Sequence, residues 1–130
     1  MIAKGCGGVI INHEKEVLLI KRKNNSTFNN LWSNPGSLIE PEETEERAVI
    51  RELEEEIGVT VKIIRKLGDY QHFENTILKG IFGGYLVEIV EGIPTIKEPN
   101  KIADLQYFPL ASLPENLAPF TKYYLDNLEV

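Results

Sequence analysis

Three glutamates near the middle of the chain, Glu52, Glu55 and Glu56, are spaced so that they could bind a metal ion. In an α-helix, residues three and four positions apart share a face, so the three carboxylates would form one acidic stripe. Like charges repel at these spacings, and a hard divalent cation such as Mg²⁺ would relieve the repulsion because it takes oxygen ligands. Mg²⁺ also keeps bound waters that a phosphate group can replace. The pattern therefore predicts metal-dependent phosphate chemistry.

A solvated acidic surface is the simpler interpretation of the same stripe, because glutamate is a good helix former and acidic helix faces are common. Three neighbouring features favour the metal instead. Arg51 directly precedes Glu52 and follows Glu43 by eight residues. Gly58 stands where a glycine would end the helix. Residues 32–40 form a strand-like segment that a Pro-Gly pair interrupts just before the helix.

Taken together, these residues resemble the signature of the Nudix (MutT-like) hydrolases, G-x5-E-x7-R-E-U-x-E-E-x-G-U, where U is a bulky aliphatic residue. The chain matches eight of the nine specified positions, at Glu43, Arg51, Glu52, Leu53, Glu55, Glu56, Gly58 and Val59. Ser37 stands at the first glycine, and Glu42 replaces another glycine that is frequent before the helix. The resemblance covers essentially the whole chain, including an opening hairpin that ends in a basic residue and a later E-P-x-K element.

The resemblance implies which groups would hold the metal. A diphosphate linkage is stable in water mainly because its charge repels nucleophiles, and carboxylate-bound Mg²⁺ offsets that charge and activates a water. The family's metal-binding glutamates match Glu52, Glu55 and Glu56, with Mn²⁺ as a substitute for Mg²⁺. The backbone carbonyl of Gly36 would join them. This last role needs no side chain, so the change at Ser37 does not remove it.

Two further roles concern the catalytic set. Arg51 would act indirectly, because a guanidinium can pair with Glu43 and hold Glu52 in its rotamer. The general base has two candidates that the sequence leaves open. One is a glutamate of the signature, Glu52 or Glu55. The other is Glu98 in the later E-P-x-K loop, which fits a solvated loop acid almost as well.

Arg22, Glu43 and Phe120 form the predicted substrate-binding set. Arg22 follows Leu18 and Ile20 at alternate positions of a predicted strand. It would either point into the site and meet a substrate phosphate, or stand exposed as a strand-end cation. Both interpretations of Arg22 stay open.

Three aromatic residues, Trp32, Phe73 and Phe120, are candidates to stack on a nucleobase. Aromatic side chains more often fill the core, so that alternative holds for each of them. His13 and His72 fall in predicted turns without metal-ligand spacing to another His or Cys, and they receive no role.

Length and composition favour a single domain over residues 1–130, and they argue against a protein that coats nucleic acid or spans a membrane. A net charge of −6 argues against binding to a nucleic-acid polymer, although a bound metal would still admit a phosphate substrate. No apolar run is long enough for a membrane span, and no signal-peptide pattern opens the chain. Cys6 is the only cysteine, which excludes an intrachain disulfide and fits a reducing cytoplasm. We expect a cytoplasmic monomer or homodimer.

Polar and apolar patterns predict an α+β protein. The main helix should run from Glu43 or Thr44 to Ile57, with Thr44 as N-cap. Strands are expected at residues 3–11 and 17–23 as a hairpin, at 59–73, at 75–89 with glycine breaks and a preceding turn at 71–75, and at 105–109. A closing helix is expected at residues 119–128. The resemblance sharpens this to a mixed β-sheet sandwiched between α-helices (α/β/α), with the signature as a loop-helix-loop.

The expected reaction is Mg²⁺-dependent hydrolysis of a nucleoside diphosphate linked to another group, first of all a nucleoside triphosphate giving the monophosphate and pyrophosphate. An ADP-ribose or other sugar-nucleotide pyrophosphatase is the alternative within the class. A Nudix domain that only binds a nucleotide and regulates another process is an alternative of another class, and the intact acidic set argues against it. An isoprenoid diphosphate isomerase shares the fold, but Cys6 lies far from the signature. The base-reading contacts lie in variable loops outside the signature.

Overall fold

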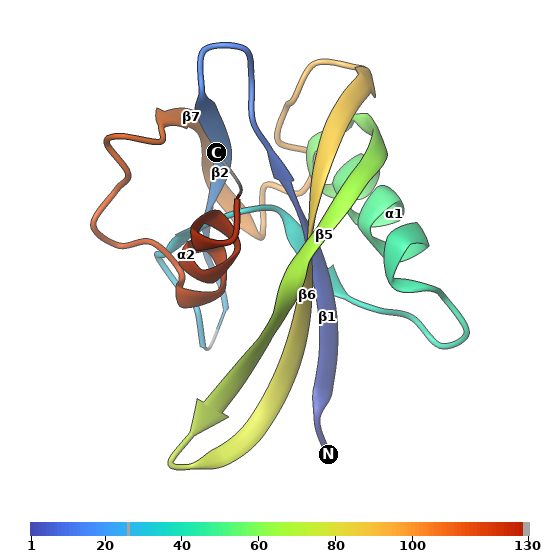
Figure 1. Cartoon of the computed structure of the whole chain (residues 1–130), viewed down its shortest axis with the longest axis vertical. Helices are drawn as coiled ribbons and strands as arrows, with labels where there is room; N and C mark the ends of the chain where they lie inside the picture. The colour runs from blue at the N-terminus through green and yellow to red at the C-terminus, as the bar shows by residue number, and fades with distance from the viewer. Residues whose placement is uncertain (26, 129–130) are drawn as a thin grey trace.

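A computed structural model describes residues 1–25 and 27–128, which form two β-sheets and two helices (Figure 1). The first sheet has the strand order β4-β1-β6-β5, with bounds β1 Ala3–Ile10, β4 Gly36–Leu38, β5 Thr60–Glu74 and β6 Ile77–Glu91. The second sheet has the order β3-β2-β7, with bounds β2 Glu16–Arg22, β3 Trp32–Ser33 and β7 Ile102–Pro109. The helices are α1, Glu45–Ile57, and α2, Pro119–Asp126.

The first sheet is mixed, because β1 runs parallel to β6 and antiparallel to β4. Helices α1 and α2 lie on opposite sides of this sheet (Figure 1). The α+β class and the sheet between helices are therefore confirmed. Within residues 1–25 and 27–128, no helix has the length and apolar character needed to cross a membrane.

Two apolar clusters build the core, one beneath each helix. Alternate residues of β2 divide between them: Leu18 and Ile20 pack with α1, whereas Val17 and Leu19 pack with α2. Successive side chains of a strand point to opposite faces, so a strand buried on both faces is a continuous apolar run. This packing holds the apolar face of α1 against the strands and thereby fixes the orientation of the helix.

Helix α1 begins and ends where the sequence predicts. The Thr44 hydroxyl accepts a hydrogen bond of 3.2 Å from the Arg47 N–H, which makes Thr44 the N-cap. Gly58 follows the last helical residue with a left-handed φ of 72°. The stripe Val49, Leu53 and Ile57 is fully buried. Glu52 and Glu56 are buried beside this stripe, and Glu55 is exposed.

The predicted opening hairpin is wrong. Its turn exists, since the Asn12 N–H donates to the Glu16 carbonyl, but β1 and β2 belong to different sheets and share only the isolated bridge Ile11–Val17. Strand β1 pairs with β6 along its whole length and with β4 at Gly5–Gly7, whereas β2 pairs with β3 and β7. The pairing of β1 with β6 joins segments that are distant in the chain, and local strand patterns do not specify which segments pair.

The predicted turn at residues 71–75 is also misplaced. Strand β5 continues to Glu74, and the connection is the two residues Asn75 and Thr76, both in the left-handed region with φ of 52° and 66°. Such a two-residue turn matches the twist of paired strands. Strand β6 runs without a break through its glycines, because neighbouring strands pair with it on both sides.

The two positions where the signature's glycines are replaced differ in backbone conformation. Gly36 has a φ of 151°, and a Cβ there would overlap the Cys6 carbonyl oxygen, so this position needs glycine. Ser37 follows it in extended conformation and pairs with Cys6. Glu42, in contrast, has a left-handed φ of 66° that side chains disfavour.

The difference predicts opposite effects of two glycine substitutions. Glu42→Gly should raise the free energy of unfolding by about 0.5–1 kcal/mol, because glycine removes the left-handed strain. Ser37→Gly should lower it by about 0.5–1 kcal/mol, because glycine loses more entropy in an extended strand, and should leave turnover within a few-fold. Urea denaturation of both variants measures the free energy of unfolding. A change of the same sign in both variants would contradict the different backbone roles of Glu42 and Ser37.

Candidate active site

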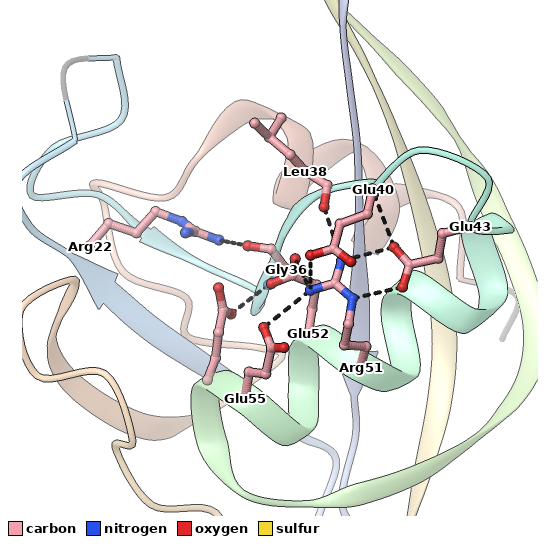
Figure 2. Close-up of polar contacts among 9 residues, drawn as sticks. Arg22, Gly36, Leu38, Glu40, Glu43, Arg51, Glu52 and Glu55 are labelled. Carbon is pink, nitrogen blue, oxygen red and sulfur yellow. Dashed lines mark hydrogen bonds and ion pairs between the residues drawn. The ribbon is translucent and has the colours of Figure 1, made fainter.

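Arg51 is the centre of the acidic face of α1 (Figure 2). Its Nε and Nη2 donate to the two carboxylate oxygens of Glu43 at 2.7 and 2.9 Å, in a bidentate pair. Its Nη1 lies 3.1 Å from Glu52 Oε1 and 3.1 Å from Glu55 Oε1. Nη2 also donates to the Leu38 carbonyl at 3.3 Å. The contacts of Arg51 with Glu43 and Glu52 are those that the sequence predicts.

Glu43 faces Arg51 and not the main cavity. The hydrogen bond from Arg51 holds the pKa of Glu43 at about 2, and the Glu40 N–H donates to the same carboxylate at 3.0 Å. Both oxygens therefore accept hydrogen bonds from the protein. The substrate role of Glu43 stays a prediction.

Glu52 and Glu56 are buried, at 6% and 4% exposure, whereas the side chain of Glu55 is 51% exposed. Glu56 Oε1 accepts a hydrogen bond of 2.9 Å from the Gly36 N–H. Burial raises the pKa of Glu56 to about 7; Arg22 and this N–H oppose the rise. Burial also raises the pKa of Glu52, against the effect of Arg51. The two buried carboxylates are thus short of positive charge.

The loop between β6 and β7 brings Glu98 to the same place. It docks on the last turn of α1, where the Thr95 and Lys97 N–H groups donate to the carbonyls of Ile57 and Glu56 at 3.0 and 2.9 Å. These carbonyls lack partners inside the helix, so the loop satisfies them. The charge of Glu98 contributes to the raised pKa of both Glu52 and Glu56. Glu98 therefore lies within electrostatic range of Glu52 and Glu56.

Arg22 reaches the site from the end of β2 (Figure 2). Its Nε donates to Ser33 Oγ at 2.7 Å, and its Nη2 donates to the carbonyls of Asn34 and Gly36 at 3.2 and 3.0 Å. Burial lowers its pKa from the ordinary value, and the charge of Glu56 opposes this. Arg22 is thus neither a solvated strand-end cation nor a fully free phosphate ligand.

The donor set fits a hard divalent cation, because it offers carboxylates and one backbone carbonyl. In the described part of the chain, no three acidic, His or Cys side chains converge closely enough to ligate an ion as they stand. Glu52 and Glu55 instead share Arg51 Nη1, and Glu56 accepts from Gly36. Binding a cation would require Glu52 and Glu55 to turn toward it, which would also relieve the charge deficit of the buried carboxylates.

A cavity of about 350 Å³ adjoins Gly36 and is lined largely by apolar side chains. Phe28, Phe82 and Phe120 meet edge-to-face in its wall, with ring centroids 5.1 to 6.2 Å apart. Arg22 also lines this cavity. The cavity wall therefore combines aromatic side chains with the backbone of Gly36.

The three predicted stacking residues have different positions. Phe120 lines the cavity. Trp32 is buried in the core against Phe108, with ring centroids 4.8 Å apart, and Phe73 is half exposed outside the cavity. The sequence missed Phe28 and Phe82. Phe82 reaches the cavity because β6 pairs with β1, a register that no local pattern reveals.

The chain matches the family model for the NUDIX domain over residues 1–128. It belongs to the Nudix family. A MutT Nudix hydrolase from Burkholderia pseudomallei has a similar structure, with a TM-score of 0.91, 31% identity and 99% of each chain covered. These similarities identify the chain as a Nudix hydrolase and the acidic helix as its Nudix signature.

Two curated relatives have narrower names. A protein of Methanocaldococcus jannaschii named ADP-ribose pyrophosphatase is 32% identical over 107 residues, which are 82% of this chain and 62% of that relative. This Nudix chain therefore spans less than two thirds of that protein. A putative 8-oxo-dGTP diphosphatase of Bacillus subtilis is 26% identical over 129 residues, 99% of this chain and 81% of that protein.

We predict that Glu55→Gln and Glu56→Gln each lower turnover about a hundredfold or more, because each removes a metal ligand or base. Glu54→Gln, on the exposed outer side of the same helix, is the matched control and should stay near wild type. Steady-state rates with Mg²⁺ and with EDTA measure this. Undiminished wild-type turnover in EDTA would refute the metal assignment.

Arg51→Lys should lower kcat clearly while KM changes less. Lysine keeps the charge but loses the planar fork that binds Glu43 and Glu52 together. The comparison of kcat with KM for the same substrate is the measurement. A defect seen only in KM would instead make Arg51 a substrate contact.

Proposed function

We propose that this Nudix hydrolase cleaves a nucleoside diphosphate linked to another group, and that its reaction is the conversion of a nucleoside triphosphate to the monophosphate and pyrophosphate. The observation that carries the proposal is the position of the aromatic cavity, which adjoins the acidic face of α1 at Gly36. A nucleoside would enter the cavity, and its phosphates would extend toward the carboxylates. A cavity of about 350 Å³ lies within the range of small-molecule sites.

Each side chain then has a task. Glu52, Glu55 and Glu56 would hold Mg²⁺ or Mn²⁺, which when bound offsets phosphate charge and lowers the pKa of a water. Phe120 stacks on the base together with Phe28 and Phe82. Arg51 keeps Glu52 oriented by binding Glu43 at the same time.

The proton of the attacking water has two candidate acceptors, a signature glutamate and Glu98. The charge of Glu98 contributes to the raised pKa of Glu52 and Glu56, which supports Glu98 as one of these candidates. A general base near the metal-bound water would speed attack on phosphorus. The proposal includes both candidates.

The names of the two curated relatives point to two related substrates. The name of the B. subtilis relative favours a nucleoside triphosphate, and the name of the M. jannaschii relative favours ADP-ribose as a second candidate. Both substrates contain the nucleoside diphosphate that the cavity and helix would bind. We expect no nucleic-acid polymer as partner, and a single cytoplasmic domain, monomeric or homodimeric, remains our prediction.

The position of bond cleavage tests the reaction. With a nucleoside triphosphate and Mg²⁺, we expect pyrophosphate and monophosphate in equal amounts, and oxygen from ¹⁸O-labelled water in only one of them. A panel of nucleoside triphosphates and ADP-ribose, separated by ion exchange and mass spectrometry, gives both results. Single phosphate as the main product would point to another mechanism, and binding without turnover across the panel would favour a regulatory domain.

A further inference from the structure

Arg22 donates three hydrogen bonds to one short segment, Ser33–Gly36. Nε binds the Ser33 hydroxyl, and Nη2 binds the Asn34 and Gly36 carbonyls, at 2.7 to 3.2 Å. Only Nη1 has no hydrogen bond within the described residues. A side chain whose main purpose was to bind substrate phosphate would present most of its planar donor fork to the cavity.

The same segment touches the acidic helix through Gly36. Its N–H donates to Glu56 at 2.9 Å, while its carbonyl accepts from Arg22 at 3.0 Å. Gly36 has no side chain, and its positive φ disfavours any residue that has one, so hydrogen bonds of the backbone must fix this position. The peptide groups on both sides of Gly36 are therefore held by Arg22 on one side and by the helix on the other.

We propose that Arg22 is a positioning residue for the metal site, which acts through Gly36 on Glu56, and that substrate-phosphate binding is not its main role. It connects the end of β2 to the carboxylates of α1 across two different sheets. The inference rests on the proposed function in one respect, that Glu56 and the Gly36 carbonyl are metal ligands.

Lysine could not replace this arrangement. Its ammonium is a compact point charge, whereas Arg22 spans a hydroxyl and two carbonyls with a rigid plane. Without Arg22, the carbonyls of Asn34 and Gly36 lose their side-chain partner in a buried place. Outer partners of metal ligands typically contribute tenfold to a hundredfold in metal affinity.

Mn²⁺ binding without nucleotide is the decisive measurement, by titration calorimetry or electron paramagnetic resonance. We expect Arg22→Lys and Arg22→Met to weaken Mn²⁺ binding about tenfold to a hundredfold. Ser33→Ala, which removes only the partner of Nε, should weaken it less. Loss of the Arg22 charge alone would strengthen binding of a cation, so weaker binding in Arg22→Met has a positional cause.

Lys21→Met is the matched control. Lys21 is the neighbouring basic residue of β2, and its side chain makes no hydrogen bond to residues 33–36, which are all described. The Mn²⁺ affinity and kinetics of this variant should therefore match those of wild type. In the Arg22 variants, kcat should fall while KM for the nucleotide changes little. Thermal unfolding identifies any variant that fails to fold. If Arg22→Met does not fold, the single variants Arg22→Lys and Ser33→Ala provide the test.

The opposite result would overturn the inference. Unchanged Mn²⁺ affinity in all Arg22 and Ser33 variants, with a raised KM that Arg22→Lys restores, would make Arg22 a phosphate ligand. Absence of Mn²⁺ binding to wild type would overturn this inference and the proposed function together. Wild type that binds Mn²⁺ but hydrolyses no nucleotide would refute only the proposed reaction, because the Mn²⁺ comparison needs no substrate.

Discussion

The burial of carboxylates at the edge of α1 is the constraint on which the rest of the site depends. Glu52 and Glu56 sit almost without solvent contact, and desolvation of a carboxylate costs free energy unless positive charge lies close by. Two arginines supply that charge from opposite sides, Arg51 from the helix itself and Arg22 from β2. Glu98 adds a further negative charge. We therefore expect the site to attract a cation.

The fold holds this charged edge in place through the apolar face of the same helix. Val49, Leu53 and Ile57 anchor α1 on the first sheet, and the N-cap and C′ glycine define its ends. A helix anchored in this way presents its glutamates at fixed positions. The loop that carries Glu98 then uses the free carbonyls at the end of α1 as its docking point, so one helix terminus positions two parts of the site.

In the proposed function, substrate recognition depends on different elements from metal binding. The cavity takes Phe82 from β6, Phe120 from α2 and Phe28 from the segment after β2. Gly36 is where the cavity and the acidic helix meet, since its carbonyl faces Arg22 and its N–H faces Glu56. We therefore expect that a change in the cavity wall alters the choice of base without disturbing the carboxylates.

The sequence by itself determined the features that arise within one segment. The helix, its cap at Thr44 and its end at Gly58 follow from residue type and spacing, because helical contacts connect residues a few positions apart. The pairing of Arg51 with Glu43 was expected from the resemblance to the Nudix signature. Only the tertiary structure decided that β1 and β2 lie in different sheets, that Phe28 and Phe82 line the cavity, and that Arg22 binds Ser33–Gly36. These contacts join segments distant in the chain, and their register is set by the packing of whole strands and not by any local pattern.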